Sequence, residues 1–142
     1  MNLDADPSPL MKWEPVLPID LVMKVPGREF PRLYAYAPLL DRGPVRVSIP
    51  AAEGVEKAVK LAASLHFSVK IIPGQPEPDQ ALRLLRLADF YLTNQTIAQP
   101  IEFFHGLFFA MVNNSDTTLW EILEKDPTRY FFVTYDGQVA AS

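Results

Sequence analysis

The chain has 142 residues, of which 49% are hydrophobic and 21% are charged, and its formal net charge is −4. This balance is that of a folded globular protein, excludes a disordered chain, and at this length favours one domain. The 13 basic residues form no run, which argues against a surface for nucleic acid or anionic lipid. The absence of cysteine excludes disulfides, thiolate metal ligands and cysteine nucleophiles.

No part of the sequence predicts export or membrane insertion. Residues 1–7 are acidic and lack the apolar run of a secretory signal. The longest apolar stretch, residues 101–112, is shorter than the ~20 residues of a membrane span and contains Glu102 and His105. We therefore expect a cytoplasmic protein without a membrane span.

Residues 1–14 are expected to form a proline-rich arm ahead of a single domain over residues 15–142. Six of the 14 prolines lie within the first 31 positions. Proline favours extended backbone in the residue before it and cannot donate a hydrogen bond to a sheet. Trp13 is expected to dock the end of the arm onto a surface, and residues 1–14 could bind a protein partner.

Three short strands are predicted next, joined by turns as a meander. Residues 19–25 and 45–49 alternate between apolar and polar side chains, which is typical of strands with one buried face. Residues 33–37 are rich in aromatic side chains and are interpreted as the strand between them. Pro26-Gly27 after residues 19–25 and Gly43-Pro44 after residues 33–37 predict the two turns.

A helix over residues 50–65 and a strand over residues 67–72 follow. Together with the strand at 45–49 they predict a right-handed βαβ crossover. His66 is expected to cap the end of the helix rather than to serve catalysis. A second helix is predicted over residues 79–92, with Leu85 and Leu92 among its inward side chains.

Residues 101–112 are predicted to form one helix that is apolar on nearly every side and must therefore be covered on every side. A short helix near residues 118–123 and a strand over 129–135 complete the chain. The predicted fold class is α+β: a small mixed sheet of 4–5 strands containing one βαβ unit, with 3–4 helices, in a ferredoxin-like or related sandwich.

The phenylalanine-rich helix has three interpretations: a core helix, a dimer face, or a membrane-surface helix. A membrane surface is disfavoured because the helix lacks a basic polar face. One sheet face would cover only about half of its circumference, which leaves an apolar patch that a two-fold contact would bury. The interface is predicted to contain the following residues: Phe103, Phe104, Phe108, Phe109, Leu87 and Tyr91.

The spacing of Glu102 and His105 would place a carboxylate and an imidazole on one face of this helix, and Asp89 is the nearest further acid. Such E-x-x-H pairs bind metals in di-iron bundles, which need two copies and additional glutamates. One copy is present here, so we expect no metal and no cofactor. Glu102 would instead favour the helix N-terminus.

No other motif predicts catalysis. The sequence contains no nucleophile elbow and no glycine-rich phosphate loop. The arginines at 42, 46, 83 and 86 could converge on an anion but are interpreted as solvated outward residues. We therefore expect a non-enzymatic protein–protein interaction or assembly module that acts as a homodimer. The alternative is a small-molecule- or metal-binding enzyme with a Glu102/His105 site.

Overall fold

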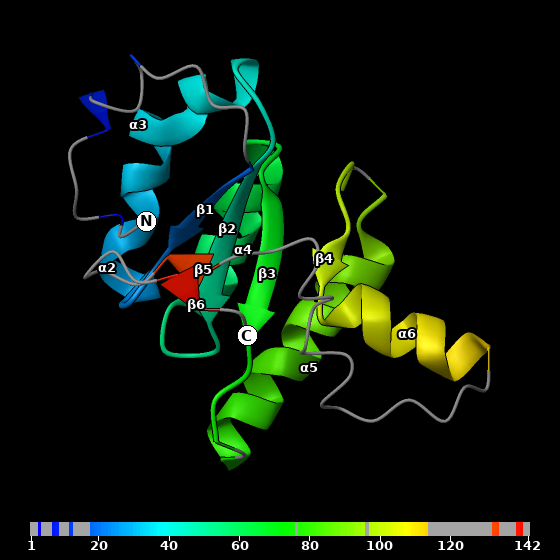
Figure 1. The fold of residues 1–142 in the computed structure, drawn as a ribbon. Coiled ribbons are helices and arrows are strands. Elements are labelled where there is room, and N and C mark those ends of the chain that lie inside the picture. Colours follow the sequence, from blue (N-terminus) through cyan, green and yellow to red (C-terminus); the bar gives the residue numbers. More distant parts are fainter. Residues whose placement is uncertain are drawn as a thin grey trace. The chain divides into compact units, whose positions relative to one another are not determined.

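The computed structural model describes residues 3, 7–8, 12, 18–75, 77–95, 97–113, 132–133 and 139–140 (Figure 1). The chain divides into two compact units, residues 1–102 and residues 103–142, and each is described by itself. Trp13 and the helix predicted near residues 118–123 lie outside the described residues.

The first unit is built on a four-stranded sheet in which every neighbouring pair is parallel. Its strands are β1 (Ile19–Val22), β2 (Val45–Pro50), β3 (Ser68–Ile72) and β4 (Ile101–Glu102), and they lie in that order (Figure 1). One row of buried side chains crosses the whole sheet through the register of the strands: Leu21, Val47, Val69 and Ile101.

The fold is therefore mixed α/β, and the predictions of a mixed sheet and a ferredoxin-like sandwich are wrong. The predicted βαβ crossover is confirmed, because β2 and β3 are parallel and α4 (Val55–Ser64) joins them. The error lies in the connection from β1 to β2, which was predicted as a meander. A parallel pair needs a long crossover, and this one is helical.

That connection consists of four short helical segments: α2 (Pro26–Glu29), η1 (Phe30–Arg32), α3 (Leu33–Tyr36) and η2 (Ala37–Asp41). The predicted strand at residues 33–37 is thus wrong. Leu33 and Tyr36 are buried whereas Tyr34 between them is 62% exposed, which is the three-residue spacing of one helix face.

Glycines bring the loops after β1 and β2 into close contact. Gly54, immediately before α4, has a left-handed φ of 86°. A Cβ at this position would lie 2.3 Å from the Cα of Gly27. The carboxylate of Glu29 accepts hydrogen bonds from the backbone N–H of Lys24 at 2.7 Å and of Val25 at 3.1 Å. These bonds stabilise the turn between β1 and α2.

Helix α4 covers the apolar face of β2 and β3, and Figure 1 shows it behind these strands. Its buried side chains are fully shielded: Val55, Ala58, Val59 and Ala62. After the helix, His66 adopts a left-handed φ of 67°, and its N–H donates to the carbonyl of Ala63. The N–H of Phe67 donates to the carbonyl of Ala62, which completes a Schellman cap.

Helix α5 (Pro78–Thr93) confirms the helix predicted at residues 79–92. Its orientation differs from the prediction, because Leu85 is 66% exposed and Leu92 is 65% exposed, whereas Leu87 is fully buried. The many leucines of this helix made its faces difficult to distinguish from the sequence.

The helix predicted over residues 101–112 is wrong at its start. Ile101 and Glu102 form β4, and α6 (Phe104–Val112) begins only after Phe103. Phe103 has φ 89° and ψ −63°, a conformation that non-glycine residues rarely adopt. This turn separates the strand from the helix, so Glu102 and His105 do not share a helix.

The second unit contains α6 and a pair of antiparallel two-residue strands, β5 (Phe132–Val133) and β6 (Val139–Ala140). Strand β5 falls within the strand predicted at residues 129–135. None of the helices in the described part of the chain is long and apolar enough to cross a membrane.

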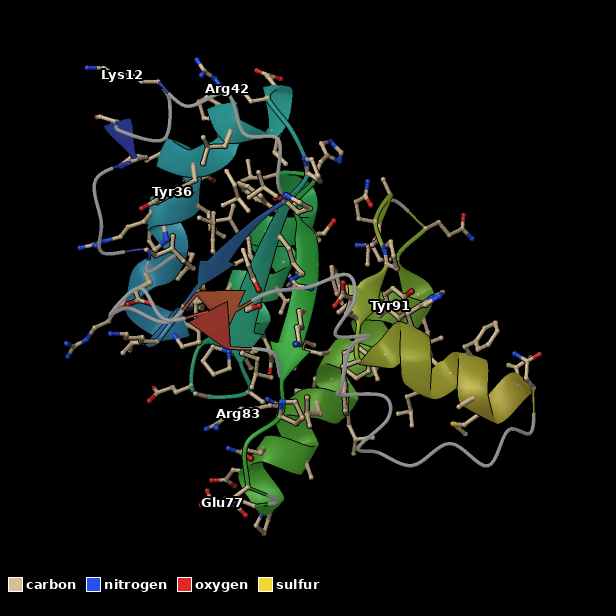
Figure 2. The ribbon with its side chains drawn as sticks, viewed as in Figure 1. Lys12, Tyr36, Arg42, Glu77, Arg83 and Tyr91 are labelled. Carbon is tan, nitrogen blue, oxygen red and sulfur yellow. The ribbon has the colours of Figure 1, made fainter. Side chains whose placement is uncertain are left out.

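One described residue of the predicted proline-rich arm, Leu3, packs against the first unit. Leu3 is only 1% exposed, and its N–H donates to the carbonyl of Val22 at 3.4 Å. Its own carbonyl accepts hydrogen bonds from Nη1 of Arg32 at 3.2 Å and from the hydroxyl of Tyr36 at 3.4 Å. Tyr36 is labelled in Figure 2. Leu3 is therefore part of the first unit's core and is not available to a partner.

Candidate functional site

The two faces of the parallel sheet differ in chemistry. One face carries the buried aliphatic side chains and packs on α4. Side chains alternate along a strand, so the intervening residues project to the opposite side. We call that side the polar face after its six polar residues: Asp20, Arg46, Ser48, Ser68, Lys70 and Glu102. By the same alternation Val22, Pro50 and Ile72 also lie on this side. Parallel sheets are usually apolar on both faces, so these charges are unusual.

Arg46 is the centre of the polar face. Its Nη2 lies 2.5 Å from Oδ2 of Asp20, and its Nη1 lies 3.5 Å from Oε2 of Glu102. Ser48 Oγ donates to Oδ1 of Asp20 at 2.8 Å. The arginine side chain is 11% exposed, whereas the carboxylate side chains are 26% and 30% exposed. The strand order thus brings together groups that are 82 positions apart at most (102 − 20).

Lys70 lies beside this network, with Ser48 and Glu102 as its register partners on the two neighbouring strands. Burial is the main cause that lowers the pKa of the Lys70 ammonium, and the positive charge of Arg46 lowers it further. The negative charges of Glu102 and Asp20 act in the opposite direction without cancelling the effect. The protein therefore disfavours the charged form of this amine.

The sequence did not predict this cluster, although one signal was present. Polar side chains alternate with aliphatic ones in the segments that become β1, β2 and β3. Their convergence depends on the parallel order of four strands, which was predicted incorrectly. Arg46 was interpreted as a solvated outward residue, whereas its side chain is more buried than those of its partners Asp20 and Glu102.

The residues predicted as possible metal ligands are not assembled into a metal site in the described part of the chain. Glu102 pairs with Arg46, and His105 stacks on Phe109 with ring centroids 6.4 Å apart. Asp89 is exposed on α5. Among the described residues there is no group of three or more histidines, aspartates or glutamates that could hold a metal ion.

The predicted interface residues differ widely in exposure. Phe109 is 64% exposed, whereas Leu87 is fully buried and Phe104 is 2% exposed. Phe103 and Phe108 are half-buried and contact the Phe104 ring at centroid distances of 5.4 Å and 6.1 Å, and Tyr91 is half-buried as well. Two apolar residues of α6 that are absent from the predicted interface are more exposed than Phe109: Met111 at 68% and Val112 at 84%.

A hollow of about 360 Å³ lies between the C-terminal ends of α4 and α5. Its lining includes Lys60, His66 and Phe90, and the Lys60 ammonium lies 5.3 Å from the centre of the Phe90 ring. A cation stacked on an aromatic ring is a satisfied surface pair.

No protein-family model, curated protein or solved structure matches this chain. Function must therefore be argued from the surfaces and side chains themselves, since an α/β fold hosts many unrelated activities.

Proposed function

We propose that the protein is a non-enzymatic interaction module that self-associates through α6. The observation that carries this proposal is the exposure of Phe109, Met111 and Val112 at 64%, 68% and 84%. Large apolar side chains of this kind on one short helix form the sort of surface that interfaces bury.

The composition of α6 favours a second copy of the chain as the occupant. The helix contains no Asp, Glu, Lys or Arg, and His105 is its one titratable side chain. An uncharged surface has no complementary charges with which to select a charged partner. In a two-fold dimer each copy presents the same patch to the other, so uncharged surfaces meet without desolvating an ion.

The length of the helix limits the strength of this contact. Nine residues span about 13 Å, so α6 alone covers far less than the ~800 Å² per partner of a stable interface. We therefore expect a reversible dimer that forms over the micromolar to millimolar range rather than an obligate one.

Sedimentation velocity of the full chain over this concentration range tests the proposal. The wild-type protein should shift from monomer to dimer as its concentration rises. Phe109→Glu should abolish the shift, because pairing two copies would bury an unpaired carboxylate. Tyr34→Glu is the matched control, since Tyr34 is 62% exposed on α3, and it should leave the dimer intact.

Outer leucines of α5 provide a second arm of the same experiment. Leu82, Leu85 and Leu92 are 50%, 66% and 65% exposed. If Leu85→Glu dissociates the dimer whereas Phe109→Glu does not, the contact belongs to α5 and the proposal for α6 is wrong. A wild-type chain that stays monomeric at every concentration would refute self-association altogether.

The alternative function, a small-molecule- or metal-binding enzyme at Glu102 and His105, has less support. Glu102 is engaged by Arg46, and His105 is engaged by Phe109. Elemental analysis of the purified protein and of His105→Ala tests this alternative. Stoichiometric metal that is lost on the substitution would favour the enzyme.

A further inference from the structure

Leu3 is held by the first unit in the way that a bound peptide is held. Both polar groups of its backbone are hydrogen-bonded, and its side chain is 1% exposed. Main-chain hydrogen bonds combined with a buried side chain are the usual means by which proteins recognise an extended peptide. We call the groups that hold this residue the Leu3 socket: the Val22 carbonyl, the Arg32 guanidinium and the Tyr36 hydroxyl.

The socket is assembled within residues 22–36, apart from the segment that fills it. Val22 ends β1, the edge strand of the sheet, where backbone groups can pair with an added peptide. Arg32 ends η1, and Tyr36 ends α3 (Figure 2). The three hydrogen bonds to Leu3 measure 3.2 to 3.4 Å, at the long end of the protein range, so the backbone of the bound segment is held weakly.

The surface beside the socket is basic. Arg28 and Arg32 are exposed and lie four positions apart on consecutive helical turns, so they project from one side of the connection. The segment that fills the socket carries the opposite charge, because Asp4 and Asp6 follow Leu3 in the sequence. A basic surface beside an apolar site favours an acidic peptide.

We propose that the Leu3 socket is a binding site for an extended, acidic peptide segment of another protein, with one leucine that enters the socket. The chain's own Leu3 segment occupies the site in the structure and acts as an intramolecular competitor. Leu3 itself is unavailable while it is bound, whereas the socket becomes available when the segment leaves. Tethering gives the segment an effective concentration on the order of 1 mM, so a partner must outcompete it.

Fluorescence anisotropy of a labelled peptide with the sequence of residues 1–8 tests this proposal on the full chain. Leu3→Ala should bind the peptide about tenfold more tightly than the wild type does, because its own segment then competes less well. The same peptide with alanine at the leucine position should not bind. Equal binding to the two full-length proteins, whether weak or strong, would overturn the proposal.

A cleavable chain keeps the test decisive if Leu3→Ala fails to fold. A protease site is inserted between residues 10 and 11, and the folded protein is cut there, so every residue of the socket is retained. The cut segment should dissociate on dilution and be displaced by the labelled peptide, while circular dichroism of the remainder stays unchanged. A segment that leaves only when the protein unfolds would identify Leu3 as a permanent core residue and refute the proposal.

Substitution of Arg32 tests the preference for an acidic peptide. Arg32→Met should weaken peptide binding several-fold, and lysine at both aspartate positions of the peptide should weaken it further. Arg83→Met, on α5, is the matched control and should have no effect. Binding that is indifferent to Arg32→Met and to the charge of the peptide would contradict the acidic class.

Sedimentation velocity separates this proposal from self-association through α6. Phe109→Glu should bind the labelled peptide as the wild type does, since the socket lies within the first unit. Leu3→Ala should leave the monomer–dimer equilibrium unchanged. Loss of the dimer in Leu3→Ala would assign the socket to the Leu3 segment of a second copy, and the proposal of a different partner would then be wrong.

Discussion

Helices α4 and α6 are nearly equal in length, with ten and nine residues. Helix α6 is the more hydrophobic of the two, yet its apolar side chains are the more exposed. In α4 Lys57 and Lys60 are exposed, whereas four apolar residues are fully buried: Val55, Ala58, Val59 and Ala62. In α6 only Phe104 is buried, and Phe109, Met111 and Val112 are largely exposed.

This contrast shows that burial depends on the surface that a helix meets rather than on its own hydrophobicity. Helix α4 packs on the apolar face of β2 and β3, which receives one side of the helix. Helix α6 is apolar all round, and a single neighbouring surface can cover only part of such a helix. The remainder is left for a further partner, which is the basis of the proposed self-association.

The largest expected effect comes from placing a charge on each helix in turn. Val59→Asp should unfold the first unit or destabilise it by more than ~3 kcal/mol, because an unpaired carboxylate would occupy a fully buried site on α4. Val112→Asp, at a site that is 84% exposed, should change stability by less than ~0.5 kcal/mol. Urea unfolding followed by circular dichroism measures both, and similar effects would break the comparison.

A second pair of substitutions divides α6 into its two faces. Phe104→Ala should cost about 3 kcal/mol, because the Phe104 ring is 2% exposed and contacts the rings of Phe103 and Phe108. Phe109→Ala should cost much less, since the Phe109 ring is mostly in solvent. Thermal unfolding of the two variants at a concentration where the chain is monomeric separates these outcomes. An equal loss would mean that Phe109 is also a core residue.

A smaller effect is expected at the loop that precedes α4. Gly54→Ala should destabilise the protein by more than about 1 kcal/mol, because φ is 86° there and the new Cβ would meet the backbone of Gly27. Gly74→Ala is the control, since its Cβ would meet only the flexible end of the Gln80 side chain. Urea midpoints of the two variants should differ, and a tolerated Gly54→Ala would show that the two loops can separate.

The same contrast explains how much of the fold could be predicted from the sequence. The strand–helix–strand unit at residues 45–72 was predicted correctly because both of its patterns are clear. In β2 apolar and polar residues alternate, and in α4 the buried apolar residues recur with the period of a helix. Where apolar residues crowd every position, as at residues 101–112, the period disappears. A two-residue strand and a turn at Phe103 were therefore read as part of one helix.

The candidate site was beyond prediction for a different reason. Arg46 meets Asp20 and Glu102 only because four parallel strands lie in sequential order. That order depends on the crossover between β1 and β2, whose helical segments are three to five residues long and too short to show a reliable period. The meander prediction placed a strand at residues 33–37 between β1 and β2, so the direct pairing of these two strands could not be foreseen.

The smallest predicted effect concerns pH and the polar face of the well-packed first unit. The folded protein lowers the pKa of Lys70 through burial and through Arg46. Between this lowered pKa and the ordinary pKa of lysine, the unfolded chain binds more protons than the folded one, so the contribution of Lys70 to stability rises with pH. Below the folded pKa the ammonium is charged in both states, and its burial then destabilises the folded state.

The free energy of unfolding of the wild type relative to Lys70→Met should therefore increase from neutral toward alkaline pH. Lys57→Met, on the exposed side of α4, is the matched control because Lys57 lies outside the polar face. Urea unfolding at several pH values measures the difference. A wild-type advantage that falls as the pH rises would show that the acidic neighbours, and not burial, dominate at Lys70.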